Sequence, residues 1–124
     1  MENKPFELKE ISNVKHDILI FKVKNPYQYG QTVEMEEGIL LDFDKDNIPV
    51  AIEIHDASKR FNIPKIALKH IQCFNMHIIV NDDVIKVFME LGVIIHNKEK
   101  SESLNYLIGN VENIPNMETE LVTA

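Results

Sequence analysis

Four acidic side chains have the types and spacing that could hold a metal ion: Asp42, Asp44, Asp46 and Glu53. They occupy positions 1, 3, 5 and 12 of the calcium-loop pattern, in which side-chain oxygens surround one hard cation. That loop usually has glycine at its sixth position and a helix on each side, whereas this chain has Asn47 there, between two expected strands. A small-ligand or metal site on this acidic segment is therefore one hypothesis, and a solvated acidic hairpin is the other.

Nucleophiles and acid–base groups give no comparable pattern. The five histidines lack the paired spacings of a zinc site, and the single cysteine has no thiolate partner. His55 beside Glu53 would make an acid–base pair, but few such pairs prove catalytic. Ser58 and Lys59 are neighbours in the chain, and adjacent side chains on a helix do not face each other. We therefore assign no catalytic residues and no cofactor, and we favour a protein that is not an enzyme.

Basic side chains gather in one stretch of this acidic chain, at Lys59, Arg60, Lys65 and Lys69. A solvated helical face is the plain explanation of such a run. The alternative is a docking surface, because a basic patch beside an acidic hairpin suits a protein partner or a second copy of the chain. We take these four residues as the candidate partner-binding residues, and we expect self-association or the binding of another small protein.

Length and charge narrow the class of protein. The chain has 124 residues, of which 44% are hydrophobic, which is enough for one domain spanning residues 1–124 with a core of its own. The formal charge of −7 would repel a phosphate backbone, so we expect no direct binding of nucleic acid. Apolar runs are short and the N-terminus has no basic head before an apolar segment, so we expect neither membrane insertion nor secretion.

The lone cysteine indicates a reducing compartment. Cys73 has no second cysteine with which to form an internal disulfide. We expect a cytoplasmic protein, with Cys73 as a small buried hydrophobic residue.

Period-two alternation of apolar residues predicts strands in the first half of the chain. Residues 17–23 alternate in this way, and residues 32–35 can form a second strand that turns at Gly38. Apolar residues at alternate positions of 39–43 and 50–54 share a face across the polar loop 44–47. Hairpin connections between neighbours then predict a meander of about four strands.

The middle of the chain changes to a helical pattern, around residues 57–71. We expect Asp56 to cap a helix start, and Asn62 to cap a second short helix with Pro64 in its first turn. Strand periodicity returns over 76–80 and 85–91, with a further strand over 93–97. Residues 98–103 are expected as a polar loop, 103–108 as a weaker strand and 118–124 as a short ending. The predicted fold class is α+β, predominantly an antiparallel β-meander.

One signature resembles a known family. It runs Leu41-Asp42-Phe43-Asp44 and continues as Ile52-Glu53-Ile54-His55-Asp56-Ala57-Ser58-Lys59-Arg60, after an opening strand at Asp17-Ile18-Leu19-Ile20-Phe21. In these residues the chain resembles the small prokaryotic family named domain of unknown function 2283, over about residues 17–61. The resemblance implies a small β-meander with a helix, no established activity, and for some members a place as the smaller partner in toxin–antitoxin pairs.

The chain departs from the family in two loop positions and in length. Asn47 and Ala51 stand where members usually have glycine, although asparagine also accepts the left-handed backbone of a turn. Members often end soon after the signature. The resemblance therefore leaves residues 73–124 as a β-rich C-terminal extension of unassigned role.

Overall fold

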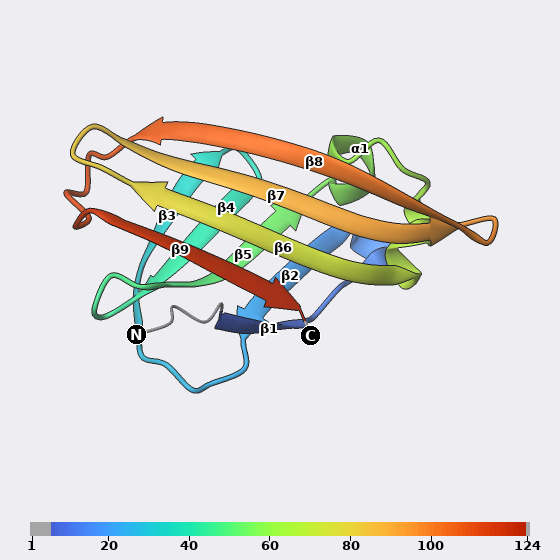
Figure 1. Ribbon diagram of the computed structural model, residues 1–124, viewed down its shortest axis with the longest axis horizontal. Helices are drawn as coiled ribbons and strands as arrows, with labels where there is room; N and C mark the ends of the chain where they lie inside the picture. The colour runs from blue at the N-terminus through green and yellow to red at the C-terminus, as the bar shows by residue number, and fades with distance from the viewer. Residues whose placement is uncertain (1–5, 124) are drawn as a thin grey trace.

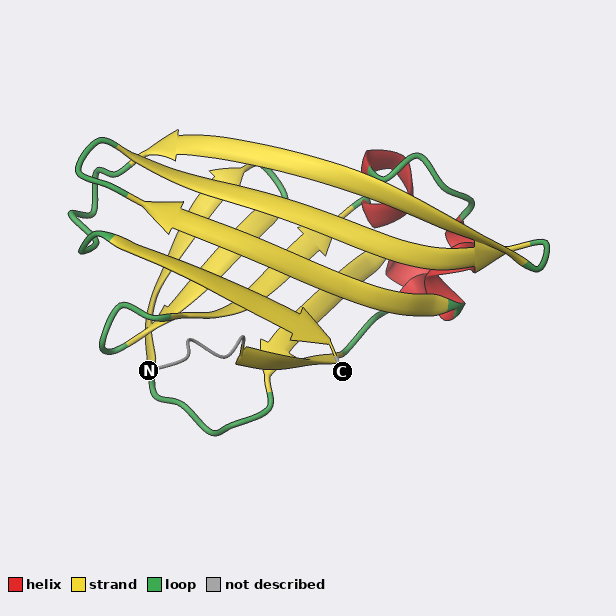
Figure 2. Ribbon diagram, in the orientation of Figure 1, coloured by secondary structure: helices red, strands yellow, loops and turns green. Residues whose placement is uncertain are grey.

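The computed structural model describes residues 6–123, which fold almost entirely into β-strands (Figure 2). The elements in chain order are β1 (Phe6–Glu10), the 3₁₀ turn η1 (Val14–His16), β2 (Ile18–Val23), β3 (Tyr29–Glu36), β4 (Ile39–Asp44), β5 (Pro49–His55), α1 (Ala57–Arg60), the 3₁₀ turn η2 (Lys65–Lys69), β6 (Ile71–Val80), β7 (Val84–Ile95), β8 (Lys98–Gly109) and β9 (Met117–Thr123). The predominantly antiparallel β fold predicted from the alternation is confirmed.

All nine strands belong to one sheet, in the order β3-β4-β5-β2-β1-β9-β6-β7-β8. The sheet curls into a nearly closed, barrel-like shape, so that β2–β5 form one layer and β6–β9 the other (Figure 1). Strand β1 joins the layers, because it pairs antiparallel with β2 and parallel with β9. Apolar side chains from both layers meet between them and form one core.

The strand order corrects the expected meander. Strand β2 pairs with β5 rather than with the next strand, with Leu19 opposite Ile54 and Phe21 opposite Ile52. The connection through residues 24–28 crosses past β5 and β4 to reach β3 at the edge. The second layer has the same relation, since β6 pairs with β9. Each layer is thus a Greek-key arrangement, which alternation alone does not distinguish from a meander because both bury the same face.

The C-terminal third also differs from the prediction. Strand β7 runs without a break through Gly92, and residues 98–109 form the long edge strand β8 instead of a polar loop and a weak strand. The expected short ending is β9, which lies in the middle of the sheet. The polar composition of 98–103 misled the prediction, because this edge strand leaves most of these side chains in solvent.

The helical segment is shorter than predicted, and its caps are different. Asp56 has a left-handed backbone (φ 52°) and makes no side-chain capping bond. The carboxylate of Asp17 takes that role instead, since its Oδ1 accepts the amide hydrogen of Ser58 at 2.9 Å and its Oδ2 the Ser58 hydroxyl at 2.7 Å. Pro64 precedes η2, and Asn62 does not cap it. Within residues 6–123 no helix is long and apolar enough to cross a membrane.

Two aromatic rings connect the layers. Phe21 of β2 and Phe74 of β6 are both buried, and their rings stack with centroids 3.9 Å apart and planes within 3°. Because alternate residues of β6 point inward from Phe74, the side chain of Cys73 points outward. The prediction of a buried Cys73 is therefore wrong, and the thiol is exposed.

Candidate functional site

The tip of the acidic hairpin is built by Asp44. Its Oδ1 accepts the amide hydrogens of Asp46 at 2.8 Å and Ile48 at 3.0 Å, which closes the turn between β4 and β5. Asn47 adopts the left-handed backbone expected of it, with φ 62°. On β4, Asp42 accepts a hydrogen bond of 2.6 Å from the hydroxyl of Thr32. Both carboxylates thus have local partners that fix them in place.

The four acidic residues lie along the hairpin rather than around one point. Asp42 is opposite Ala51, while Glu53 is opposite Leu40, two residue pairs further along the ladder. Asp42 and Glu53 are both half-buried on the outer face, as the alternation predicted. In the part of the chain that the structure describes, no three His, Cys, Asp or Glu side chains are grouped so as to share a metal ion.

His55 and Glu53 do come together. They lie at alternate positions of β5 and therefore on the same face, with His55 Nε2 3.2 Å from Glu53 Oε2. The contact is not aligned as a hydrogen bond, and Nε2 has no other hydrogen-bond partner among the described residues. Both side chains remain about one third or more exposed, at 41% and 34%. The two side chains therefore lie on the sheet surface, although the Nε2 atom of His55 is itself shielded from solvent.

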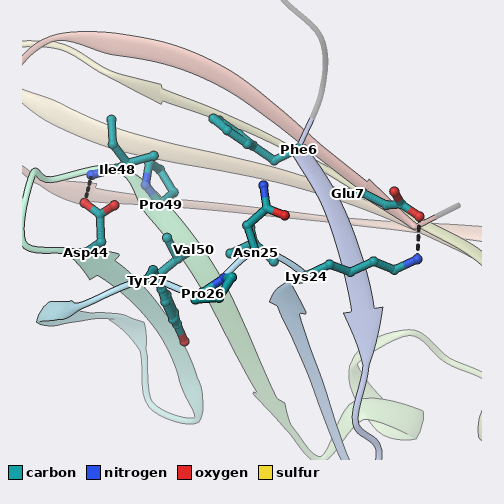
Figure 3. Close-up of a pocket in the computed structure, with 11 residues that line it drawn as sticks. Phe6, Glu7, Lys24, Asn25, Pro26, Tyr27, Asp44, Ile48, Pro49 and Val50 are labelled. Carbon is teal, nitrogen blue, oxygen red and sulfur yellow. Dashed lines mark hydrogen bonds and ion pairs between the residues drawn. The ribbon is translucent and has the colours of Figure 1, made fainter.

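A pocket of about 410 Å³ opens at the end of the molecule where the hairpin tip lies (Figure 3). Its lining comes from three separate parts of the chain: Phe6, Glu7, Val23, Lys24, Asn25, Pro26, Tyr27, Asp44, Ile48, Pro49 and Val50. The floor is mainly apolar, and Lys24 forms an ion pair with Glu7 at the rim. We call this the end pocket. Asp44 is the residue that links it to the acidic segment singled out in the sequence.

Tyr27 is the titrating phenol beside the acidic hairpin. Its partial burial, together with the nearby Asp42 carboxylate, raises the pKa of the Tyr27 hydroxyl above its ordinary value, because both disfavour a phenolate. The neutral hydroxyl is therefore the form present at neutral pH, and it is available as a hydrogen-bond donor at the edge of the end pocket.

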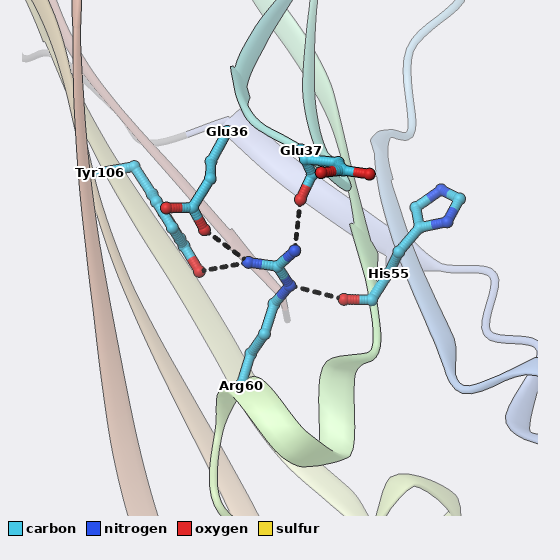
Figure 4. Close-up of polar contacts among 5 residues, drawn as sticks. All are labelled: Glu36, Glu37, His55, Arg60 and Tyr106. Atoms are coloured by element: carbon cyan, nitrogen blue, oxygen red, sulfur yellow. Dashed lines mark hydrogen bonds and ion pairs between the residues drawn. The ribbon is translucent and has the colours of Figure 1, made fainter.

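The basic residues divide into different roles. Arg60 bridges the two edge strands of the sheet, β3 and β8, where Nη1 donates to Glu36 at 2.7 Å and to the hydroxyl of Tyr106 at 3.2 Å (Figure 4). Its Nε donates to the carbonyl of His55 at 2.7 Å, and its Nη2 to the carbonyl of Glu37. Burial lowers the pKa of Arg60, but the bonds to Tyr106 and Glu36 outweigh it and raise the pKa overall. Arg60 therefore has a structural role, because its hydrogen bonds hold the edge strands β3 and β8 together.

Gly38 leaves the space that the Arg60 guanidinium occupies. It turns the chain between β3 and β4 with φ 87°, and a Cβ atom there would lie 2.8 Å from Arg60 Nη2. Of the other basic residues, Lys65 donates to the carbonyl of Lys15 at 2.8 Å, while Lys59 and Lys69 are exposed. The four residues do not form one continuous free surface, since Arg60 is engaged.

The outer face of β6, β7 and β8 carries apolar side chains that the sequence analysis missed. Ile79, Phe88 and Leu107 are 36%, 40% and 59% exposed on three adjacent strands. With their neighbours they line a shallow groove of about 490 Å³: His77, Ile79, Lys86, Val87, Phe88, Asn105, Tyr106 and Leu107. We call this surface the β6–β8 face. A signal existed at Val87-Phe88-Met89, where a large apolar residue interrupts the alternation.

The comparisons with known proteins agree with the sequence signature. Residues 15–58 match the family model described as "Protein of unknown function (DUF2283)". A protein of Methanosarcina mazei, described as "Putative hypoxanthine phosphoribosyltransferase", is 35% identical over 101 residues, which span 82% of this chain and 80% of the relative. No solved structure matches the chain. The chain therefore belongs to the DUF2283 family of proteins of unknown function.

Proposed function

We propose that this protein is a non-enzymatic interaction module that binds another protein chain through its β6–β8 face. The observation that carries this proposal is the exposure of Ile79, Phe88 and Leu107 on three paired strands. Ile79 and Leu107 flank Lys86 in one row across the strands, and Phe88 lies in the next row, diagonal to both. Single exposed apolar residues are ordinary, but a contiguous group on a flat sheet surface is typical of a protein contact. The partner is a second copy or another small protein.

Leu107→Glu tests this proposal. A charge at the most exposed of the three positions would have to be buried in the contact, so we expect the variant to lose its associated chain. The measurement is the native mass of the complex purified from the protein's own cells. Val111→Glu is the matched control, because Val111 is 81% exposed on the loop after β8 and is not among the residues lining the groove.

Both variants should keep the circular dichroism and melting temperature of the unmodified protein, because neither side chain is in the core. Associated mass that persists unchanged in Leu107→Glu, or a protein that is monomeric in every preparation, contradicts the proposal.

A second candidate function is the binding of a small heteroaromatic molecule in the end pocket. Phe6, Pro26 and Pro49 offer flat apolar surface, and Asp44 offers a carboxylate oxygen, Oδ2, that accepts no hydrogen bond from the described residues. A base with ring N–H groups fits such a site, and the name of the Methanosarcina relative contains one, hypoxanthine. This candidate also covers the ligand-binding hypothesis for the acidic hairpin.

Titration with hypoxanthine by calorimetry tests the second candidate. We expect binding that is lost in Asp44→Asn, since that change removes the carboxylate charge while its amide oxygen still accepts the turn amides. Asp46→Asn, at an exposed position outside the end pocket, is the control. Calcium is added in a parallel thermal-shift experiment as the test of a metal at the same residues. No heat and no thermal shift in the unmodified protein would remove this candidate.

A further inference from the structure

Strand β7 presents a charge pattern that is its own complement. Lys86, Phe88 and Glu90 follow one another at alternate positions on its outer face. The two charged residues lie on either side of Phe88, each about 6.7 Å from it along the strand. Neither has an ion-pair partner within 4.0 Å among residues 6–123. If a second copy is rotated by 180° about an axis that passes Phe88 and runs across the strands, Lys86 of each copy lies over Glu90 of the other.

We infer that two copies of the chain associate face to face through the β6–β8 face, about a two-fold axis that passes between their Phe88 side chains. This inference rests on the function proposed above and identifies the partner chain as a second copy of this protein. Strand β7 of each copy runs antiparallel over β7 of the other, so that Lys86 of each chain faces Glu90 of its mate. The two Phe88 rings meet at the axis. Ile79 and Leu107, which flank Lys86, are covered by Asn75 and Ser103, which flank Glu90 of the mate.

The geometry of stacked sheets permits this contact. Aligned sheets pack about 10 Å apart and are rotated by about 30°. At a distance of about 6.7 Å from the axis, that rotation moves a side chain sideways by about 3.5 Å, which the flexible Lys86 side chain can follow. Long side chains from both faces therefore bridge the gap, with aromatic contact in the centre and one charged pair on each side of it along the strands.

The charge of the β6–β8 face makes it a better place for two copies to meet than most other surfaces of this chain. The protein carries a formal charge of −7, so two copies repel each other wherever acidic surface meets acidic surface. On the outer face of β6–β8, the central rows hold one lysine and one glutamate, with His77 beside them: Asn75, His77, Ile79, Lys86, Phe88, Glu90, Ser103, Asn105 and Leu107. The centre of this face is therefore close to neutral, which lowers the repulsion between two acidic molecules there. Its border with β9 is acidic, since Glu118 and Glu120 are exposed beside β6, and Glu118 pairs with His77 at 2.7 Å.

Charge reversal provides the test. Lys86→Glu and Glu90→Lys each convert both ion pairs across the axis into like-charge pairs, so each variant alone should weaken the dimer about 10-fold or more. An equimolar mixture of the two variants should form a heterodimer, because the two acids of one chain then face the two lysines of the other. The double variant K86E/E90K should likewise recover a homodimer. Sedimentation equilibrium over a concentration series measures all four samples.

Lys45→Glu is the control for the net charge of Lys86→Glu, since it makes the same change of charge at an exposed position on the opposite layer. Weak association of both single variants together with a monomeric mixture would overturn the two-fold arrangement. A native complex that needs Leu107 but contains a different protein would overturn the inference while leaving the proposed function standing. A dimer unaffected by Leu107→Glu would remove both.

Discussion

Replacing Phe74 with alanine is expected to lower the free energy of unfolding by about 3–5 kcal/mol, because the change deletes a buried ring and leaves a cavity between the layers. Phe74 is 1% exposed, and its ring stacks on Phe21 of the other layer. The loss includes the contact between two aromatic rings in addition to the buried area. Urea unfolding followed by circular dichroism measures the change through its midpoint and slope.

Phe6→Ala is the matched control for this prediction. Phe6 is 43% exposed, so its removal should cost well under half as much as the loss of the buried ring. If Phe74→Ala proves no more destabilising than Phe6→Ala, the two layers do not share a tightly packed core at this point.

Asp17→Ala is expected to lower the free energy of unfolding by about 2–3 kcal/mol, since hydrogen bonds to a charged group contribute more than neutral ones. The Asp17 carboxylate holds both the amide and the hydroxyl of Ser58, which is 41 residues further along the chain. Its backbone is also left-handed (φ 57°), a conformation that aspartate accepts more readily than alanine. Thermal unfolding with urea titration measures the loss.

Ser58→Ala separates the two hydrogen bonds. It removes only the hydroxyl and leaves the bond from the Ser58 amide to Asp17, so we expect a loss of about 1 kcal/mol. Equal stability of the two variants would show that the bond from the Ser58 amide to Asp17 contributes nothing to the fold. Asp17 and Ser58 lie near the two ends of the region matched by the family model, residues 15–58, so this contact ties the start of that region to its end.

The strands could be predicted from local pattern, whereas their neighbours could not. Alternation correctly assigned inward positions such as Leu41, Ile52, Met76 and Val87, because side-chain direction follows from period two. It did not indicate that β2 lies beside β5, since that depends on which connection crosses the sheet. Strand β9 was missed because it is short and largely polar on one side, although Leu121 is fully buried.

The candidate sites divide in the same way. The acidic hairpin follows from residues close together in the sequence, and its turn was predicted from Asn47. The end pocket needs Phe6, Lys24 and Ile48 from three distant segments, so no local pattern could reveal it. The role of Arg60 was likewise hidden, because its partner Tyr106 lies on the other layer. The sequence alone does not indicate whether a basic side chain is solvated or bonds two strands of the fold together.

The pairing of β1 with β9 has a consequence for how the chain folds. Phe6 pairs with Leu121, so the strand that joins the layers requires residues from near both limits of the described chain. During synthesis β9 leaves the ribosome after every other described strand, and until then one side of β1 has no neighbour. We expect folding to be slow, because a contact so distant in sequence must form against a large loss of chain entropy. Meanwhile the exposed backbone of β1 is open to pairing with other molecules, and a chaperone that shields it would raise the yield of folded protein.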